Sequence, residues 1–472
     1  MNQGADQNAS PPVNPLGTQS IGRLLVKYAV PSIISMLVMS IYNIVDQIFI
    51  GRSAAGYLGN GATTVAFPLI TVMLAISLLI GNGAAAYINL QMGRGNYEAA
   101  KKTTGNCILA VVFLGVFLCA AVLLFLKPIL TALGATDLVM PYAVDYTSVI
   151  VLGAPFAMTA SGLTAIIRSD GSPRFSMIAA LAGAGLNVIL DPIFIFPWGL
   201  NLGVKGAALA TVLSQIVSSI LVLYYLTRKA KFTRLELSGL KPDFRLLRTV
   251  AAYGSSSFVT QMAISIVNVV MNNTLRHYGA LSVFGSEIPL SAMGIVMKIN
   301  AILISIILGT VIGAQPILGY NYGAGNYRRV RRTYLTEICI TATLAGIVNL
   351  LFIVTPGTFI GIFGEQEAQF NQFASMALRT YLCCVTAAGI QIPSANYFQA
   401  VGKPLKAMTL SMMRQLFLLV PALLILPVYF GLNGALYAGP VADIGSFLIT
   451  GSFILREMRQ LSARAEPSVQ QV

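Results

Sequence analysis

The chain has 472 residues, of which 56% are hydrophobic and only 10% are charged, and its mean hydropathy is +0.76. Soluble domains carry about 25% charged residues, so the composition excludes an ordinary soluble protein. Because about 20 consecutive apolar residues cross a bilayer as a helix, the repeated apolar runs predict an all-α polytopic membrane protein. The formal net charge of +14 lies mainly in loops between these runs, so it does not indicate a nucleic-acid partner.

The first residues of the chain differ from the rest. Residues 1–20 are polar and rich in Pro, Asn and Ser. They lack the basic start and short apolar core of a signal peptide, and we expect them to form a disordered cytoplasmic tail. The five cysteines all fall within apolar runs, and none has metal-ligand spacing with a His. Neither a disulfide framework nor a metal centre is therefore expected.

Twelve apolar runs are long enough to be membrane spans. In chain order they lie near residues 28–50, 64–90, 106–126, 141–167, 175–196, 203–227, 250–275, 288–318, 335–355, 374–399, 406–430 and 432–455. An even number of spans places both chain ends on the same side of the membrane. Residues 456–472 are then a second cytoplasmic tail.

The basic residues predict which side that is. Of the 30 lysines and arginines, 23 fall in segments on the side of the chain ends and 4 on the other side. Because cytoplasmic loops carry the excess of Lys and Arg, we expect both termini in the cytoplasm and the spans in the cell (inner) membrane.

The two halves of the chain repeat one another. The stretch GRGNYEAAKKT at 93–103 recurs as GAGNYRRVRRT at 323–333, and four shorter matches recur in order at nearly the same offset. This pattern predicts two lobes of six helices each, an arrangement found in transporters that move two bundles against each other. The predicted N-terminal lobe covers 21–227, a basic linker covers 228–249, and the C-terminal lobe covers 250–455.

Two of the acidic residues inside predicted spans of the first half are candidates for a functional site. Asp46 is five residues before Gly51 and Asp191 is six residues before Pro197. At about 1.5 Å rise per residue, both carboxyl groups should lie at a similar depth in the outer half of the membrane. An ionisable residue at membrane depth is costly and points to function. The alternative is that these acids are solvated near the interface or only brace two helices.

The surroundings of Asp191 suit a cation. Asn187 is four residues earlier and lies on the same helical face, and Thr211 of the next span could add a hydroxyl. Pro192 removes a backbone donor, which leaves the carbonyl of Val188 without its helical partner. Oxygen ligands of this kind suit a hard cation such as Na⁺, and the carboxyl groups could instead bind a proton.

The second half lacks these acids and has its own charges, Lys298, Arg414 and Asp443. One acid and two bases predict an internal ion pair with one base left over. A structural role is the main alternative to a functional one, because paired charges in membranes often only satisfy each other.

The sequence resembles the multidrug and toxic compound extrusion (MATE) transporters, and within them the MepA-like and DinF-like bacterial branch. The resemblance covers nearly the whole chain and is most specific in GLNVILDPIFIF at 185–196, in GVKGAALAT at 203–211 and in YAVPSIISML at 28–37. It implies two six-helix lobes around a central cavity. It also implies export of lipophilic, often cationic drugs in exchange for Na⁺ or H⁺, and so a drug-resistance antiporter rather than an enzyme.

Carried over residue by residue, the resemblance implies a cation or proton site at Asp46, Asn187, Asp191 and Thr211, and a bend of the first span at Pro31. No cofactor is expected besides the coupling ion, and the chain is expected to function as a monomer in the lipid bilayer. Candidates for the cavity wall, for which plain helix packing is the alternative, are Tyr42, Gln47, Phe156, Met158, Met293, Met297 and Gln391.

Two other functions compete with drug export. A flippase for lipid-linked precursors would need cavity cations for its phosphates, which Lys298 and Arg414 could supply. An intramembrane enzyme is disfavoured because the only histidine, His277, ends a span and no long hydrophilic loop could hold a catalytic domain. The chain also has no Gly-Lys-Ser/Thr phosphate-binding motif, which argues against ATP as the energy source.

Overall fold

The computed structural model describes residues 14–53, 56–361 and 368–465, and these residues form helices joined by short connections. Ten helices are long and apolar enough to cross a membrane, and two more pairs of helices qualify as bent spans. The bent pairs are α6 with α7, at 55°, and α14 with α15, at 45°. Counting each pair as one span gives the twelve predicted spans. Each bent pair is the fourth span of its half, so the repeat extends to the bends.

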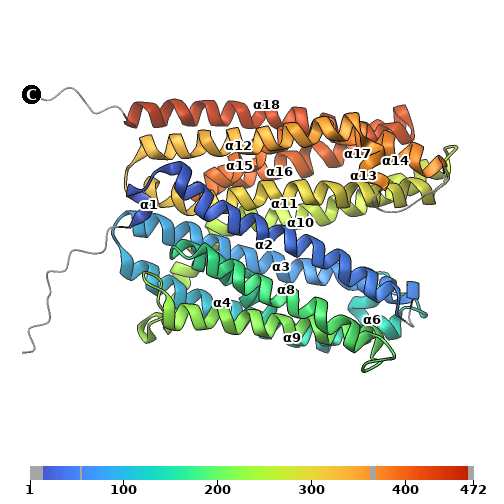
Figure 1. Ribbon diagram of the computed structural model, residues 1–472, viewed down its shortest axis with the longest axis horizontal. Helices are drawn as coiled ribbons and strands as arrows, with labels where there is room; N and C mark the ends of the chain where they lie inside the picture. The colour runs from blue at the N-terminus through green and yellow to red at the C-terminus, as the bar shows by residue number, and fades with distance from the viewer. Residues whose placement is uncertain (1–13, 54–55, 362–367, 466–472) are drawn as a thin grey trace, which may run out of the picture.

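The N-terminal lobe contains the first six spans and occupies the lower half of Figure 1. Its helices are α2 (Ile21–Gly51), α3 (Gly56–Gly93), α4 (Tyr97–Leu124), α5 (Leu126–Ala132), α6 (Met140–Leu152), α7 (Ala154–Ser169), α8 (Pro173–Ile195) and α9 (Gly203–Tyr224). A π-helical turn, η1 (Tyr225–Lys229), ends the lobe.

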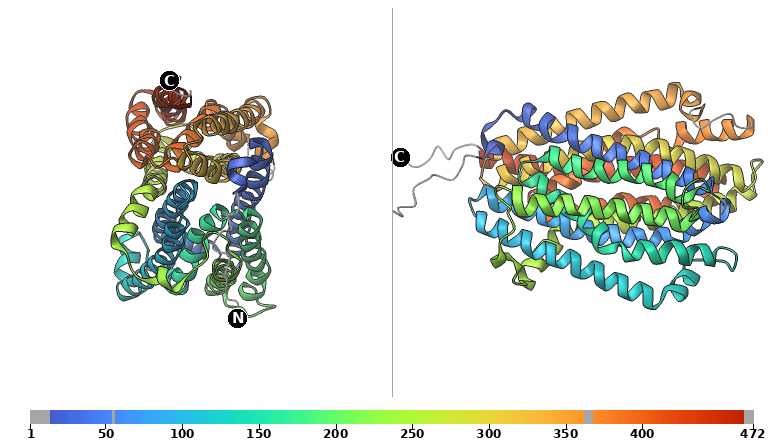
Figure 2. Two further views of the ribbon diagram at one scale, coloured as in Figure 1. Left: turned by 90° about the vertical axis from the view of Figure 1, so that its left-hand side faces the viewer. Right: turned by 60° about the horizontal axis from the view of Figure 1, so that its bottom comes forward.

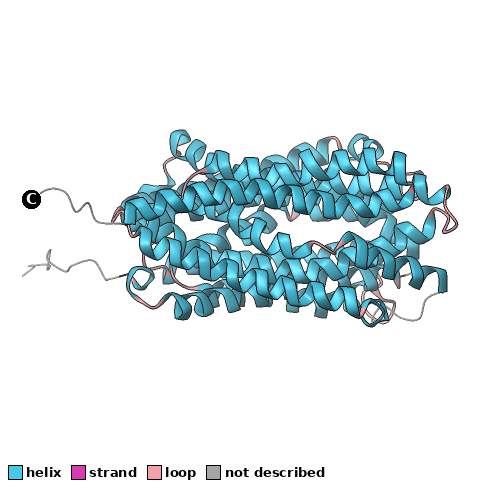
Figure 3. Cartoon of the chain, turned by 90° about the horizontal axis from the view of Figure 1, so that it is seen from above, coloured by secondary structure: helices cyan, strands magenta, loops and turns pink. Residues whose placement is uncertain are grey.

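The C-terminal lobe contains the other six spans and occupies the upper half of Figure 1. Its helices are α10 (Phe244–Ala280), α11 (Glu287–Gly323), α12 (Tyr327–Val354), α13 (Pro356–Gly361), α14 (Ala368–Tyr381), α15 (Ala388–Ala400), α16 (Pro404–Met412), α17 (Val420–Phe430) and α18 (Leu432–Ala465). A 3-10 turn, η3 (Val385–Ala387), joins α14 to α15, and a π-helical segment, η4 (Met413–Leu419), joins α16 to α17. The helices of both lobes run along the long axis of the molecule (Figure 3).

Both predicted tails are partly structured. Residues 14–20 contain a short helix, α1 (Pro15–Thr18), in which Leu16 is buried and Asn14 caps the backbone N–H of Leu16 at 3.1 Å. The disorder predicted for this segment is therefore wrong, because Leu16 packs into the C-terminal lobe; residues 1–13 lie outside the described residues. At the other end α18 continues to Ala465, since Glu457 and Leu461 turn toward the lobe and are buried.

The start of α1 and the end of α18 lie at the same end of the bundle, on the left of Figure 1. The loops between α3 and α4 and between α11 and α12 lie there as well, as the end-on view in Figure 2 shows. We refer to this as the termini end and to the opposite side as the far end.

The two lobes pack backbone to backbone near the termini end. Helix α10 packs on α3 and α11 packs on α2. A Cβ at Gly254 would lie 1.8 Å from the carbonyl oxygen of Leu79, and a Cβ at Gly83 would lie 2.1 Å from that of Val250. Neither position can therefore hold a side chain unless the helices separate. Asn82 Nδ2 also donates to Ser257 Oγ across this contact, at 3.0 Å.

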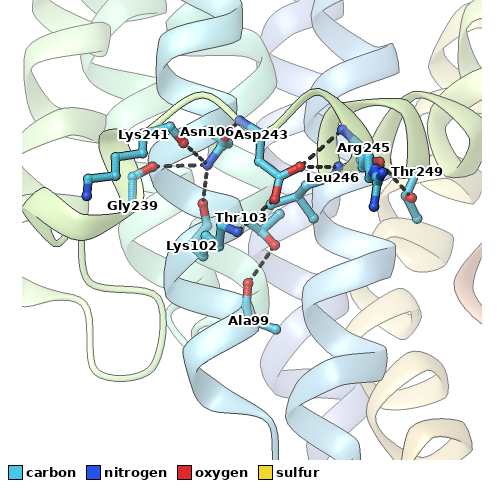
Figure 4. A network of polar contacts seen from close by, with 10 residues as sticks. All are labelled: Ala99, Lys102, Thr103, Asn106, Gly239, Lys241, Asp243, Arg245, Leu246 and Thr249. Carbon is cyan, nitrogen blue, oxygen red and sulfur yellow. Dashed lines mark hydrogen bonds and ion pairs between the residues drawn. The ribbon is translucent and has the colours of Figure 1, made fainter.

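The linker between the lobes is anchored to α4 (Figure 4). Buried Asn106 donates to the carbonyl oxygens of Gly239 at 3.0 Å and Lys241 at 3.2 Å, and accepts from the backbone N–H of Asp243 at 2.7 Å. The Asp243 side chain caps α10 and forms a 2.7 Å ion pair with Lys102. The hydrogen bond from Lys102 lowers the pKa of Asp243 from its ordinary 3.8, so at neutral pH the carboxylate stays ionised and the ion pair is kept. The predicted linker, 228–249, thus ends in a helix that begins at Phe244.

Replacing Gly254 by Ala should weaken the contact between the lobes at the termini end. The added methyl group collides with backbone rather than with a flexible side chain, so α10 must move away from α3. We expect the midpoint of thermal unfolding in detergent to fall. The matched control is Gly451→Ala in α18, where a Cβ meets nothing within 4 Å and Ala should be neutral or slightly stabilising. Equal behaviour of the two variants would contradict the close packing.

Replacing Asn106 by Ala should release the linker from α4. The change leaves two linker carbonyls and one backbone N–H without their side-chain partner, at a cost of about 1–3 kcal/mol for each group that stays buried. We expect faster trypsin cleavage after the basic residues of the linker. Thr249→Ala is the control, because that hydroxyl bonds only to a carbonyl of its own helix. Unchanged cleavage of the Asn106 variant would show that the linker is held elsewhere.

Candidate functional site: a buried pair of acids in the N-terminal lobe

The structure brings the predicted cation-site residues together from three helices. Asp46 lies on α2, Asn187 and Asp191 lie one turn apart on α8, and Thr211 lies on α9. The Asn187 amide donates to Asp191 Oδ1 at 3.1 Å and to Thr211 Oγ1 at 3.3 Å. Asp46 and Asp191 are close enough for their carboxyl groups to interact electrostatically across the α2–α8 contact. All four residues predicted from the sequence therefore form one cluster.

Several oxygens of this cluster have no hydrogen-bond partner among the described residues. They are Asp46 Oδ1, Asp191 Oδ2 and Asn187 Oδ1, and all three are buried. The Asp191 side chain is fully buried and that of Asn187 is 1% exposed. Buried acceptors without donors are costly, and two neighbouring carboxylates repel each other strongly in a medium of low dielectric constant. This set of oxygens fits a bound proton or a hard cation.

Two tyrosines lie against the acids. Tyr42, one turn before Asp46 on α2, and Tyr146 of α6 both interact electrostatically with Asp46 and Asp191. Tyr42 was a sequence candidate for the cavity wall, whereas Tyr146 was missed. Tyr146 lies in a predicted span next to an acid, Asp145, but nothing in the sequence shows that it turns toward α2.

The two prolines lie within helices. Pro31 is inside α2, which runs without interruption from Ile21 to Gly51. The hydroxyl of Ser35 donates to the Pro31 carbonyl at 2.9 Å, within the same helix. Pro192 lies in the last turn of α8, directly after Asp191. Both prolines are therefore on helices that carry an acid of the cluster.

The other candidates for the cavity wall occupy different environments. Gln47 is exposed on the turn after Asp46, and Phe156 is 39% exposed. Met158 and Met293 are buried in the hydrophobic cores of the N-terminal and C-terminal lobes, so in this structure they serve helix packing.

The two remaining wall candidates, Met297 and Gln391, also lie in the C-terminal lobe. Met297 is half-buried and packs against the core of that lobe. Gln391 of α15 is buried, and its Oε1 has no partner among the described residues. Because its amide oxygen is buried without a donor, Gln391 could contact a ligand. Met297 instead contributes to helix packing.

The charges of the C-terminal lobe form the predicted ion pair with one base left over. Arg414 Nε donates to Asp443 Oδ1 at 2.7 Å, joining the π-helical segment η4 to α18. Lys298 is exposed on α11, and it forms no ion pair among the described residues.

Among the described residues, Glu337 is a buried acid without hydrogen-bond partners that was not identified from the sequence. Glu337 of α12 is fully buried, and neither carboxyl oxygen has a hydrogen-bond partner in the described part of the chain. The sequence could have identified Glu337, because it is an acidic residue within the predicted span 335–355. Burying an unpaired charge is costly, so the neutral form of this carboxyl group is favoured. Helix α12 contributes no residue to the cluster around Asp191.

Twelve spans in two repeated lobes, with an acid pair buried in one of them, define a helical membrane transporter. The comparisons with known proteins agree. The family model MatE matches residues 31–193 and 256–424, and the chain belongs to the MATE family of multidrug transporters.

Individual relatives match this chain over most of their length. Multidrug export protein MepA of Staphylococcus aureus (strain N315) is 26% identical over 422 residues, covering 89% of this chain and 90% of that protein. MepA of Staphylococcus saprophyticus is 27% identical over 425 residues, with 90% and 91% covered.

Among solved structures, the MATE multidrug transporter DinF-BH, solved as a complex, aligns with a TM-score of 0.86 and 33% identity, covering 93% of this chain and 97% of that one. An outward-facing multidrug resistance MATE family transporter aligns with a TM-score of 0.88 and 23% identity, with 95% and 98% covered. The second likeness shows the fold alone.

Breaking the C-terminal ion pair from one side should destabilise the protein. Arg414→Met leaves the Asp443 carboxylate buried without its partner, and such changes cost about 3–5 kcal/mol. We expect a lower midpoint of thermal unfolding, with part of the loss recovered when Asp443→Leu is added. Lys298→Met is the control, since that side chain is exposed. If Arg414→Met unfolds at the wild-type temperature, the pair contributes nothing to stability.

Proposed function

We propose that this chain is a secondary active exporter in the cell membrane that moves lipophilic, cationic drugs outward in exchange for Na⁺ or H⁺. The observation that carries the proposal is the pair of neighbouring carboxyl groups, Asp46 and Asp191, buried with unpartnered oxygens. A drug cation and the coupling ion can satisfy the same negative site, but not both at once. Competition of this kind produces exchange.

Helix α2 is suited to transmit the state of the site to the interface between the lobes. It carries Asp46, and its Ser40 hydroxyl lies 2.7 Å from that of Ser305 on α11 of the other lobe. Pro31 removes one backbone hydrogen bond from α2 and makes it easier to bend. In the proposed cycle, binding of the ion at Asp46 and Asp191 changes the shape of α2 and expels the drug. The ion can drive this change only through its different affinity for the two shapes.

The close glycine contacts at the termini end support alternating access. They seal the interface between the lobes on the side where both chain ends lie. The excess of basic residues in the loops at this end supports a cytoplasmic location for it. With the lobes in close contact there, a substrate would leave from the far end. A single chain holds both lobes and the whole acid cluster, and we propose that it functions as a monomer.

Transport of a lipid-linked precursor is a weaker alternative. Such a cargo carries phosphates and needs free cations in the cavity. Arg414 is neutralised by Asp443, which leaves Lys298 as the single unpaired base of the three charges that the sequence identified in this lobe. The acid pair instead favours a cationic cargo.

Asp191→Asn should abolish ion-coupled export. We would load proteoliposomes with ethidium and impose a Na⁺ gradient and a pH gradient separately. For the wild type we expect one gradient to drive efflux, and for the variant we expect a rate at least about tenfold lower, as befits loss of an interaction of about 1.4 kcal/mol or more. Asp145→Asn is the matched control, because Asp145 is an exposed acid on α6 of the same lobe.

Normal coupling in Asp191→Asn would remove the acid pair from the mechanism. The search would then turn to Glu337 and to the charges of the C-terminal lobe. If neither gradient moves ethidium in the wild type, the proposed exchange of drug for ion is wrong.

A further inference from the structure

A basic pocket lies at the termini end, where the first residues of α2 meet the first turns of α12. Its volume is about 370 Å³, and its lining includes Ser20, Gly22, Arg328, Arg329, Arg332 and Thr336. We refer to it as the α2–α12 pocket. Its walls come from both lobes, and it is separate from the acid cluster around Asp191.

The pocket carries positive charge that no acid offsets. Among the described residues, none of its three arginines forms an ion pair with a carboxylate. Arg329 is used in structure, because it donates to the carbonyl oxygens of Gln19 at 2.6 Å and Leu16 at 3.2 Å. Arg328 and Arg332 are exposed, one turn apart on α12, and have no such bonds. Their guanidinium groups are available to an anion.

The start of α2 adds to this positive field. Ser20, the residue before α2, makes no side-chain cap to the helix, and the first turn contains no acid. The first backbone N–H groups of a helix lack helical acceptors and carry the positive end of its dipole. Guanidinium groups and open N–H groups together form the chemistry that recognises phosphate.

Further from the termini end, the faces of α2 and α12 that line the pocket carry exposed apolar side chains. On α2 the face of Gly22 continues in steps of four to Val26, Val30 and Ile34, which are 64%, 46% and 38% exposed. On α12 the face of Arg328, Arg332 and Thr336 continues to Ile340 and, two turns further, to Ile347, which are 38% and 55% exposed. Residues four apart lie on one side of a helix, so each helix presents a polar end above an apolar stripe.

We propose that the α2–α12 pocket binds the phosphate of an anionic phospholipid in the leaflet at the termini end, with the acyl chains along the apolar stripes of α2 and α12. A free phosphate compound would use the arginines but not the apolar stripes. Basic pockets of membrane proteins at this depth suit anionic headgroups. The inference rests on the placement of the chain in a membrane, and it is independent of which ion drives export.

Because the pocket lies between the two lobes, a lipid bound there would affect how the lobes are arranged. It bridges α2, which carries Asp46, and α12 of the other lobe. A ligand that contacts both lobes favours the conformation in which its two walls are close together. Anionic lipid therefore stabilises the closed termini end.

The test measures lipid binding by the full-length purified protein. Phosphatidylglycerol would be titrated into protein held in zwitterionic nanodiscs or detergent, with retained lipid counted by native mass spectrometry and the unfolding midpoint recorded. The variant is Arg328→Gln with Arg332→Gln. The control is Arg456→Gln with Arg459→Gln, which removes the same charge from exposed positions on α18. We expect the pocket variant to bind about tenfold more weakly or worse, and the control to match the wild type.

Three results would overturn the proposal. Equal weakening in both double variants would show a diffuse charge effect. Equal stabilisation by phosphatidylcholine would show that the anionic headgroup is not recognised. Equal affinity for glycerol 3-phosphate would identify a soluble phosphate site that does not use the apolar stripes. None of these readouts depends on transport, so failure here leaves the ethidium experiment intact, and failure there leaves lipid binding intact.

Discussion

The repulsion between Asp46 and Asp191 is the constraint on which the rest of the site depends. Their carboxyl groups are buried and close together, and three oxygens around them have no donor in the described part of the chain. Two negative charges cannot remain there together without a proton or a cation. Because the acids come from two helices, α2 and α8, whatever neutralises them also determines how closely those helices pack. Binding of a proton or cation is thus linked directly to the packing of α2 against α8.

In the proposed mechanism, the duplicated fold would convert that local event into a relative motion of the two lobes. Each lobe has six spans and a bent fourth span, and the lobes meet through glycines that admit no side chain near the termini end. Among the described residues, however, the neighbouring pair of carboxyl groups lies in the N-terminal lobe. The C-terminal lobe neutralises Asp443 with Arg414 internally, at 2.7 Å. In the proposed cycle the N-terminal lobe therefore responds to the coupling ion, while the C-terminal lobe supplies the surface against which α2 would move.

Hydropathy and spacing predicted the parts of the structure that depend on the chain alone. The spans follow from apolar length, and the matched depth of Asp46 and Asp191 follows from counting residues to the helix ends. The sequence does not predict which face of an almost wholly apolar helix points toward the cavity, because such a helix has no polar face that would indicate its orientation. Met158 and Met293 are therefore candidates for the cavity wall with helix packing as the alternative, and their positions in the lobe cores favour packing. For the same reason the sequence does not single out Tyr146. The composition of residues 14–20 predicts disorder. These residues are ordered because Leu16 is buried against a distant part of the sequence, and local composition does not reveal that contact.

The most direct test of the central claim is the affinity of the purified protein for a lipophilic cation, measured against Na⁺ concentration at fixed pH and against pH at fixed Na⁺. If drug and ion share the acid pair, the dissociation constant for the drug must rise as the coupling ion is added, and by reciprocity the drug must weaken binding of the ion. Neutralising Asp46 should remove this dependence. A drug affinity that is unchanged by both Na⁺ and pH in the wild type would show that drug and ion do not compete, and would contradict the account.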